Sequence, residues 1–152
     1  MMNIIEKLIA KNLTIGAVES FTGGGFSNHL TNISHASQVF KGGIVAYDPS
    51  IKNQVVGVDQ KIIDTVGTIS KECALELAKQ GKERLKADIV VSFTGNAGPT
   101  ASEDKPVGLV YIAFSYPSTT KVYELHLEGT RKQIKKQAIA FACQEIENYL
   151  GI

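Results

Sequence analysis

The feature that most constrains the fold is a short apolar strand pattern that ends in a run of hydroxyl residues and glycines. Residues 14–19 (Thr-Ile-Gly-Ala-Val-Glu) predict the strand, residues 20–24 (Ser-Phe-Thr-Gly-Gly) follow it, and residues 24–32 have a helical pattern. A strand-to-helix turn of this kind exposes a hydroxyl at the end of a strand and directs backbone N–H groups at the same point. The pattern therefore indicates an α/β fold with a functional site at this turn.

The rest of the chain alternates strand and helix patterns. Further strands are predicted at 43–47, 88–93, 107–115 and 121–127, and further helices at 2–11, 49–56, 59–67, 71–86 and 131–150. Early strands that alternate with helices predict parallel pairing through right-handed crossovers, and the last two strands predict an antiparallel hairpin. We therefore expect a three-layer α/β/α sandwich on a mixed, mainly parallel sheet, formed by one domain over residues 1–152.

Composition narrows the class of protein. The 152 residues are 43% hydrophobic and 20% charged, and the net charge of +1 favours neither nucleic acid nor an anionic membrane as a partner. The apolar runs are too short to span a bilayer, and the chain begins with an amphipathic pattern that carries charges rather than with a cleavable signal. We expect a cytoplasmic protein that contacts neither nucleic acid nor membrane.

The cysteines and histidines predict no metal or disulfide. Cys73 and Cys143 fall in separate predicted helices, with no CxxC motif and no histidine at ligand spacing. Buried free thiols are the plainer interpretation, since a disulfide is unusual in a reducing compartment. We therefore expect no metal ion and no cofactor.

Three predicted strands end in unusual loops that should share one edge of the sheet. The first delivers Ser20, the second ends at Tyr47 with Lys52 a few residues on, and the third delivers residues 94–99 (Thr-Gly-Asn-Ala-Gly-Pro). Ligands of open α/β sheets bind beyond the carboxyl ends of the strands. If these strands are parallel neighbours, the three loops line one site.

Within this set, Ser20 is the candidate nucleophile and Lys52 the candidate base. A serine hydroxyl needs a base, and none of the three histidines lies at a predicted strand end. Lysine can serve where burial or a helix dipole lowers its pKa, and Lys52 should sit near a helix N-terminus. Tyr47 could pass a proton between the two or hold one of them by a hydrogen bond. The helix that begins at Gly23 and Gly24 should offer unpaired N–H groups to an oxyanion or a phosphate.

Each of these residues also has a plainer explanation when taken alone. Ser20 or Thr22 could simply cap a helix, Lys52 could be a solvated lysine, and Tyr47 a half-buried strand aromatic. Residues 94–99 could be a tight connection, and Arg131 could cap or salt-bridge a helix end. The glycine run is not a P-loop, because no Gly-Lys-Ser/Thr follows it. Only the combination of these features is specific.

Taken together, these residues resemble the CinA C-terminal domain family over essentially the whole chain. Residues 17–24 resemble its AESxTGG signature, and residues 42–47 with Lys52 resemble its second motif. The remaining elements follow in order: 94–99 (TGxAGP), 105–108 (KPVG) and 129–131, which resemble the family's Gly-Asp-Arg. In some relatives this domain follows a larger one, for which we expect no room in a chain of this length.

The resemblance implies a nicotinamide-nucleotide amidase, which converts nicotinamide mononucleotide and water into nicotinate mononucleotide and ammonia without a metal. It also implies an α/β/α fold and a homo-oligomer. Carried onto this sequence, Ser20 would be the nucleophile, Lys52 the general base and Tyr47 its helper. The substrate would be bound by residues of the two glycine loops and by Arg131 at the phosphate: Thr22, Gly23, Gly24, Thr94, Gly95, Ala97, Gly98 and Arg131.

Several positions depart from the family pattern, all on the substrate side. Phe21 replaces a frequent Cys, Asn96 a usual apolar residue, Thr130 an Asp, and Lys135 a common Arg, while residues 100–104 lack the usual glycines. These departures keep two alternatives open. One is a non-catalytic nucleotide-binding or partner-binding module, and the other is an amidase for a different pyridine-type amide.

Overall fold

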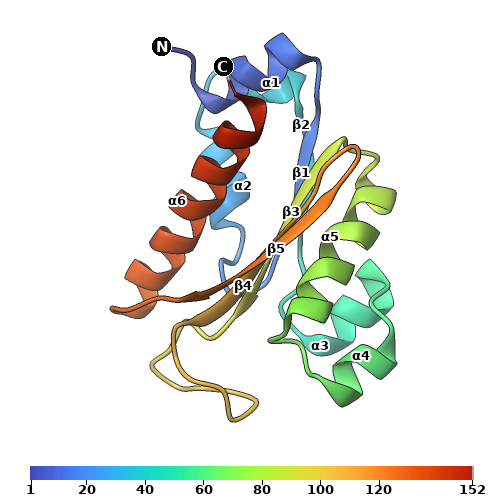
Figure 1. Ribbon diagram of the computed structural model, residues 1–152, viewed down its shortest axis with the longest axis vertical. Coiled ribbons are helices and arrows are strands. Elements are labelled where there is room, and N and C mark those ends of the chain that lie inside the picture. The colour runs from blue at the N-terminus through green and yellow to red at the C-terminus, as the bar shows by residue number, and fades with distance from the viewer. Residues whose placement is uncertain (152) are drawn as a thin grey trace.

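A five-stranded mixed sheet forms the centre of the computed structural model, which describes residues 1–151 (Figure 1). The strands lie in the order β2-β1-β3-β4-β5. Their bounds are Ile15–Glu19 for β1, Phe40–Val45 for β2, Ile89–Gly95 for β3, Leu109–Ser115 for β4 and Thr120–His126 for β5. The pairs β1–β2 and β1–β3 are parallel, whereas β3–β4 and β4–β5 are antiparallel. The predicted mixed sheet and its C-terminal hairpin are confirmed.

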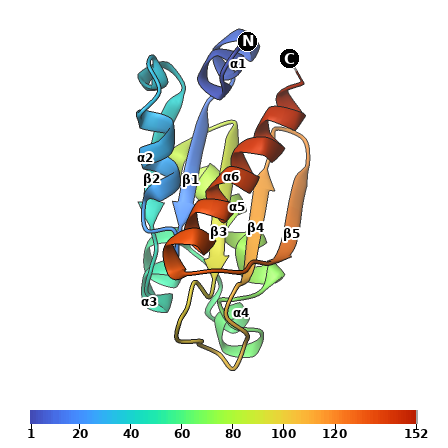
Figure 2. The same cartoon turned by 90° about the vertical axis from the view of Figure 1, so that its left-hand side faces the viewer.

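Helices cover both faces of this sheet, which confirms the predicted three-layer sandwich (Figure 2). One layer holds α1 (Ile4–Lys11), α2 (Gly25–Thr31) and the long α6 (Arg131–Leu150), with a short 3-10 turn at Ala36–Gln38. The other holds α3 (Pro49–Ile51), a π-helical turn (Lys52–Val56), α4 (Gln60–Thr65) and α5 (Lys71–Leu85). Polar side chains start these helices as expected: Asp48 caps α3, and Ser70 caps α5.

The second strand differs from its prediction. It was expected at 43–47, but β2 begins at Phe40 and ends at Val45. The strand lies at the sheet edge, and its side chains alternate between half-buried and exposed, so its first residues lack the apolar run that marks a buried strand. Beyond it, the Ala46 N–H still donates to the Glu19 carbonyl at 2.8 Å, while Asp48 already caps the next helix.

Apolar side chains fill both spaces between the helices and the sheet. β3 is buried on both faces along nearly its whole length, as its continuous apolar sequence predicts. On one face, Phe26 of α2 packs against Phe93 of β3 with ring centroids 5.3 Å apart. On the other, α5 approaches β1 closely at Gly81, where an added Cβ would lie 2.5 Å from a methyl group of Val18. These contacts fix the strand ends that carry the candidate site.

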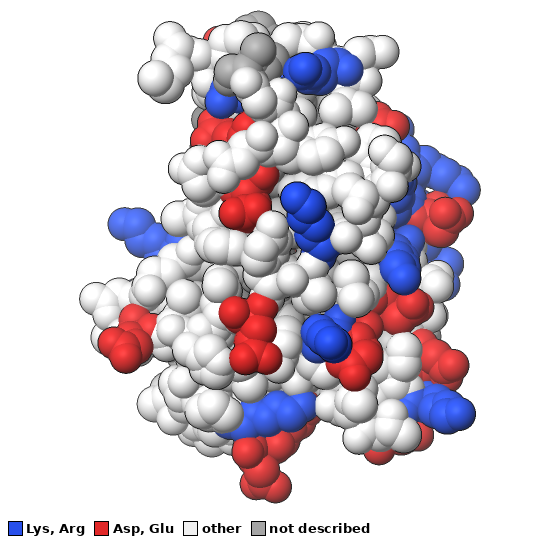
Figure 3. Space-filling model, in the orientation of Figure 1, with Lys and Arg blue, Asp and Glu red and all other residues white. Residues whose placement is uncertain are grey.

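No helix within residues 1–151 is long and apolar enough to cross a membrane. The face shown in Figure 3 mixes acidic with basic side chains, in keeping with the net charge of +1. This face therefore presents no broad field of one sign.

Candidate active site

The carboxyl ends of β1, β2 and β3 meet at one edge of the sheet, where a cavity of about 510 Å³ opens. Residues from all three predicted loops line it, including Ser20, Lys52 and Asn96. Arg131, from the first turn of α6, closes a further side. The convergence expected from the order of the strands is therefore found in the structure.

Ser20 and Lys52 meet directly inside this cavity. The Lys52 Nζ lies 3.0 Å from the Ser20 Oγ. The same nitrogen lies 2.8 Å from the Ala46 carbonyl oxygen and 3.0 Å from that of Tyr47. Lys52 is 2% exposed and Ser20 8% exposed, so a contact between side chains 32 positions apart is almost sealed from bulk water. This is the geometry that a nucleophile and its base require.

Local structure explains why Lys52 points inward. Asp48 caps the chain after β2, Pro49 occupies the first helical position, and the backbone then widens into a π-helical turn that starts at Lys52. Such turns are rare and often mark functional sites. The turn ends at Gly57, whose φ of 99° suits a residue without a Cβ. The sequence predicts these start and end points but not the π-helical turn.

Burial shifts the pKa of Lys52. It lowers the pKa of the amine below its ordinary value, against smaller opposing effects of Cys73, Asp48 and Glu103. Sequence reasoning emphasised the helix dipole, whereas burial is the main cause. Burial also raises the pKa of the nearby Cys73 thiol to about 11, so this cysteine stays protonated near neutral pH and does not compete as a nucleophile.

Glu19, to which sequence reasoning gave no role, holds the nucleophile turn in place. Its carboxylate is 1% exposed and accepts hydrogen bonds from the N–H groups of Phe26 and Ser27, both at 2.9 Å, and from the Ser27 hydroxyl at 2.7 Å. It therefore caps α2, whose N-cap residue Gly24 has no side chain. The sequence signal that could have indicated this role is an acidic residue that lies next to Ser20 and a few residues before the predicted helix.

This capping corrects one expectation about the helix start. The N–H groups of Phe26 and Ser27 are bound by Glu19, and that of Gly23 donates to the Ser20 carbonyl at 3.0 Å. They are therefore not available to an oxyanion. Among the described residues, the N–H groups of Phe21, Thr22 and Gly24 make no hydrogen bond to the protein, and Phe21 lines the cavity.

Of the two roles expected for Tyr47, the structure disfavours the proton relay. Because Ser20 and Lys52 are in direct contact, no tyrosine hydroxyl lies between them to relay a proton. The Tyr47 carbonyl oxygen accepts from Lys52, whereas its hydroxyl oxygen accepts from the Arg131 Nη2 at 3.0 Å. The Arg131 Nη1 donates to the Gly98 carbonyl oxygen at 2.6 Å. Tyr47 thus holds Lys52 through its backbone and Arg131 through its ring.

The remaining predicted binding residues fall into two groups. Thr94, Gly95 and Ala97 line the cavity, and Gly98 lies beside it through its bond to Arg131. Thr22, Gly23 and Gly24 are not among the lining residues: the Thr22 side chain is buried, with a hydroxyl that has no partner within residues 1–151, and Gly23 faces solvent. Their binding role stays a prediction.

Two residues to which sequence reasoning gave no structural role shape the cavity wall. The Asn96 amide bonds Ser102 and the Lys105 carbonyl at 2.9–3.1 Å and so closes the loop after β3. The Glu103 carboxylate accepts from the Thr68 and Ile69 N–H groups ahead of α5. Burial alone would raise the pKa of Glu103, but these hydrogen bonds, with those of the Thr68 hydroxyl and Lys105, hold it below its ordinary value. Both residues stand in the segment that departs from the family pattern.

Comparison with known proteins agrees with the motifs. The family described as CinA C-terminal domain matches residues 1–150. The chain belongs to the CinA C-terminal domain family. A putative competence-damage inducible protein of Bacillus subtilis (strain 168) is 45% identical over 136 residues, and one of Bacillus cereus (strain ATCC 10987 / NRS 248) is 44% identical over 138. The matches cover 90% of this chain but only 33% and 34% of those proteins, so the chain spans about a third of their length.

Solved structures share the fold along nearly the whole CinA domain. The competence/damage inducible protein CihA from Agrobacterium tumefaciens is 30% identical with a TM-score of 0.92, over 98% of this chain and 92% of that one. A CinA superfamily protein from Enterobacter cloacae is 23% identical with a TM-score of 0.93, over 99% of this chain and 94% of that one. The second likeness establishes the α/β fold alone.

Proposed function

We propose that this chain is a nicotinamide-nucleotide amidase that uses Ser20 as nucleophile and Lys52 as general base. The observation that carries the proposal is the buried 3.0 Å contact between the Ser20 Oγ and the Lys52 Nζ, inside a cavity formed by strand-end loops. Membership of the CinA C-terminal domain family supports the reaction class, since the motifs of this chain resemble those of the family's amidases.

The contacts of Lys52 suit a neutral amine. A neutral amine has two N–H donors and one lone pair, whereas an ammonium has three donors and no acceptor. The carbonyl oxygens of Ala46 and Tyr47 take the two donors, which leaves the lone pair to accept the Ser20 proton. The lowered pKa of Lys52 favours this state.

The reaction then proceeds in two steps. In acylation, Lys52 accepts the Ser20 proton as the Oγ attacks the carboxamide carbon, and it gives that proton to the leaving nitrogen, which departs as ammonia. In deacylation, Lys52 accepts a proton from water as the water attacks the ester. It returns the proton to the Ser20 oxygen, and nicotinate mononucleotide is released.

Backbone donors next to the nucleophile suit the tetrahedral intermediate. Phe21 directly follows Ser20 and lines the cavity, and its N–H has no partner within the described chain, so we assign this N–H to the oxyanion. The phosphate end of the substrate is assigned to Arg131, whose guanidinium has five donors, only two of which are used by Gly98 and Tyr47.

The test is to incubate the protein with nicotinamide mononucleotide, nicotinamide riboside or nicotinamide, and to measure ammonia and the acid product together. We expect equimolar ammonia and nicotinate mononucleotide from the nucleotide, with slower release from the two compounds that lack the phosphate. A faster rate with another pyridine amide would support the alternative substrate class. Absence of ammonia from every compound would overturn the amidase proposal.

A second candidate, a non-catalytic nucleotide-binding module, is favoured by one observation. The loop after β3 is closed by Asn96 and Glu103, where the family pattern has an apolar residue and glycines. This candidate predicts saturable binding of the nucleotide without product, and equal binding by a Ser20→Ala variant. Calorimetry alongside the ammonia assay distinguishes the two, because any turnover rules out the purely non-catalytic version.

A further inference from the structure

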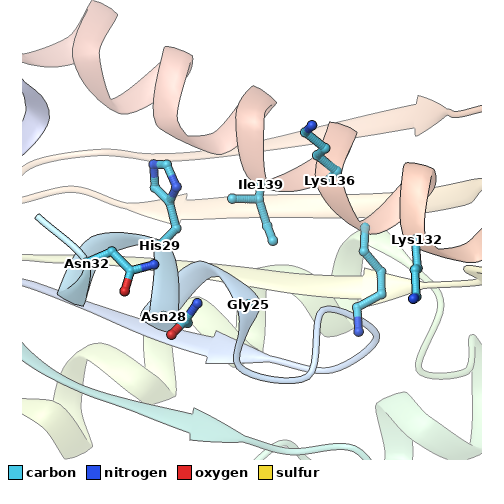
Figure 4. Close-up of a pocket in the computed structure, with 8 residues that line it drawn as sticks. Gly25, Asn28, His29, Asn32, Lys132, Lys136 and Ile139 are labelled. Carbon is cyan, nitrogen blue, oxygen red and sulfur yellow. The ribbon is translucent and has the colours of Figure 1, made fainter.

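A groove of about 330 Å³ lies between α2 and α6, outside the cavity that holds Ser20 and Lys52 (Figure 4). Lys132, Lys135 and Lys136 of α6 line it together with His29 of α2. Figure 4 shows His29 rising from α2 toward α6, with Ile139 between the two helices. The groove thus combines a small apolar wall with side chains that donate hydrogen bonds.

Positive charge in this groove is unbalanced. None of its lining residues is acidic, and the three lysine side chains form no ion pair or hydrogen bond within the described part of the chain. They stand at i, i+3 and i+4 on one helix, where like charges repel. Lys132 also lies in the first turn of α6, which has no acidic residue and where the helix dipole disfavours a cation. A bound anion would relieve both unfavourable interactions.

We propose that the groove is a second anion site, which binds a phosphate group as inorganic phosphate or as a small phosphate monoester. The Lys132 and Lys135 ammonium groups and the Asn28 amide can donate to phosphate oxygens, and the His29 ring and the Asn32 amide are further donors in the groove. The Lys136 ammonium points away from that of Lys132 and adds positive charge at the rim (Figure 4). The volume accepts a small molecule but not a folded partner. Ile139 gives an apolar surface to the organic part of an ester.

The groove adjoins the nucleophile turn. The Lys135 Nζ lies 3.6 Å from the position that a Cβ on Gly23 would occupy, and Gly25 lines the groove as the first residue of α2. An anion bound there contacts the same turn that presents Ser20. This site is separate from the one assigned to Arg131, which lines the cavity, and it does not depend on the proposed amidase activity.

The test measures phosphate binding by calorimetry and by the NMR signals of the His29 ring. The variant K132Q/K135Q/K136Q removes the groove charges, and K61Q/K79Q/K121Q removes three exposed lysines elsewhere. We expect saturable binding of inorganic phosphate or ribose 5-phosphate that shifts the signals of His29 but not those of His126, which does not line the groove. The groove variant should bind at least about tenfold more weakly, while the control variant and Arg131→Gln keep their affinity. Which of the two ligands binds more tightly identifies the source of the phosphate.

The same variants provide a second readout that needs no ligand of known identity. Removing mutually repelling charges should raise the thermal midpoint of the groove variant at low salt, and phosphate should then stabilise it less than wild type. Sodium chloride at equal ionic strength is the control for screening. The proposal is overturned if chloride stabilises wild type as much as phosphate does, if the groove variant keeps wild-type affinity, or if Arg131→Gln alone abolishes binding.

Discussion

At the scale of single residues, the site depends on how buried polar groups are satisfied. Lys52 has three oxygen atoms within 3.0 Å of its Nζ, and Glu19 has three donors within 2.9 Å, although both side chains are nearly inaccessible to solvent. Buried charges are costly unless they are bonded or neutralised. Lys52 meets this requirement by a lowered pKa, and Glu19 by its contacts with the first turn of α2.

The pH dependence of activity should report Lys52. Loss of its proton creates the base, so kcat/KM should rise as the pH rises through the pKa of Lys52 and level off above it. The midpoint should lie below 10.5, the ordinary lysine value, because burial favours the neutral amine. Lys52→Arg should lower kcat by about 10²–10⁴-fold at every pH, since arginine stays protonated. Lys61→Arg serves as control, and a Lys52→Arg variant that keeps wild-type activity and pH profile would refute the assignment.

Glu19→Gln should destabilise the fold. The amide nitrogen cannot accept a hydrogen bond, so the Phe26 or Ser27 N–H loses a charge-assisted bond in a buried position. We expect the free energy of unfolding to fall by about 2–3 kcal/mol in urea denaturation. Glu83→Gln on the exposed side of α5 is the matched control. Equal midpoints for these two variants would show that Glu19 does not hold the turn.

At the scale of elements, two departures from the family pattern have a structural explanation. Thr130 caps α6, and together with Gln133 it forms a capping box, so a hydroxyl caps this helix at the position where the family pattern has an Asp. Asn96 replaces an apolar residue and ties the loop after β3 to Ser102 and Lys105. Thr130 thus stabilises the start of the helix that carries Arg131, and Asn96 stabilises the loop after β3 that lines the cavity.

Gly81 tests how closely α5 must approach the sheet. Alanine is the better helix former by about 1 kcal/mol, but its Cβ would lie 2.5 Å from the Val18 side chain and 3.2 Å from that of Val90. The cost of overpacking should exceed the gain in helix propensity. We therefore expect Gly81→Ala to lower the free energy of unfolding by a net amount of about 0.5–2 kcal/mol. Lys79→Ala on the exposed face of the same helix should change it by less than about 0.5 kcal/mol. A higher free energy of unfolding for Gly81→Ala would show that α5 can move away from the sheet without cost, and so would contradict the requirement for close packing.

At the scale of the whole molecule, the site is assembled from segments that are far apart in the sequence. Arg131 in α6 contacts Gly98 after β3 and Tyr47 after β2, so one guanidinium joins three segments across the cavity. If the Arg131 guanidinium also binds the phosphate, Arg131→Gln should lower kcat/KM for nicotinamide mononucleotide by about 10–100-fold. The same variant should have little effect on nicotinamide riboside, which lacks the phosphate. Equal losses for the two substrates would assign Arg131 a purely structural role.

Sequence reasoning predicted the architecture because hydrophobic periods and capping residues are local signals. The continuous apolar run of β3, the caps at Asp48 and Ser70 and the glycine that ends the π-helical turn all lie where these signals place them. What it missed depends on tertiary contacts. The bonds of Glu19 to α2, the exposure of Tyr47 and the closure of the loop by Asn96 each require knowledge of which segments become neighbours.

The proposed mechanism depends above all on covalent attack by Ser20 on the carboxamide of nicotinamide mononucleotide. The most direct measurement is the initial rate of ammonia release by wild type and by Ser20→Ala, at saturating nucleotide and after circular dichroism has shown that both are folded. We expect release by wild type and a loss of about 3–6 kcal/mol of transition-state stabilisation in the variant, which is roughly 10²–10⁴-fold in rate. Equal rates for the two folded proteins would contradict it.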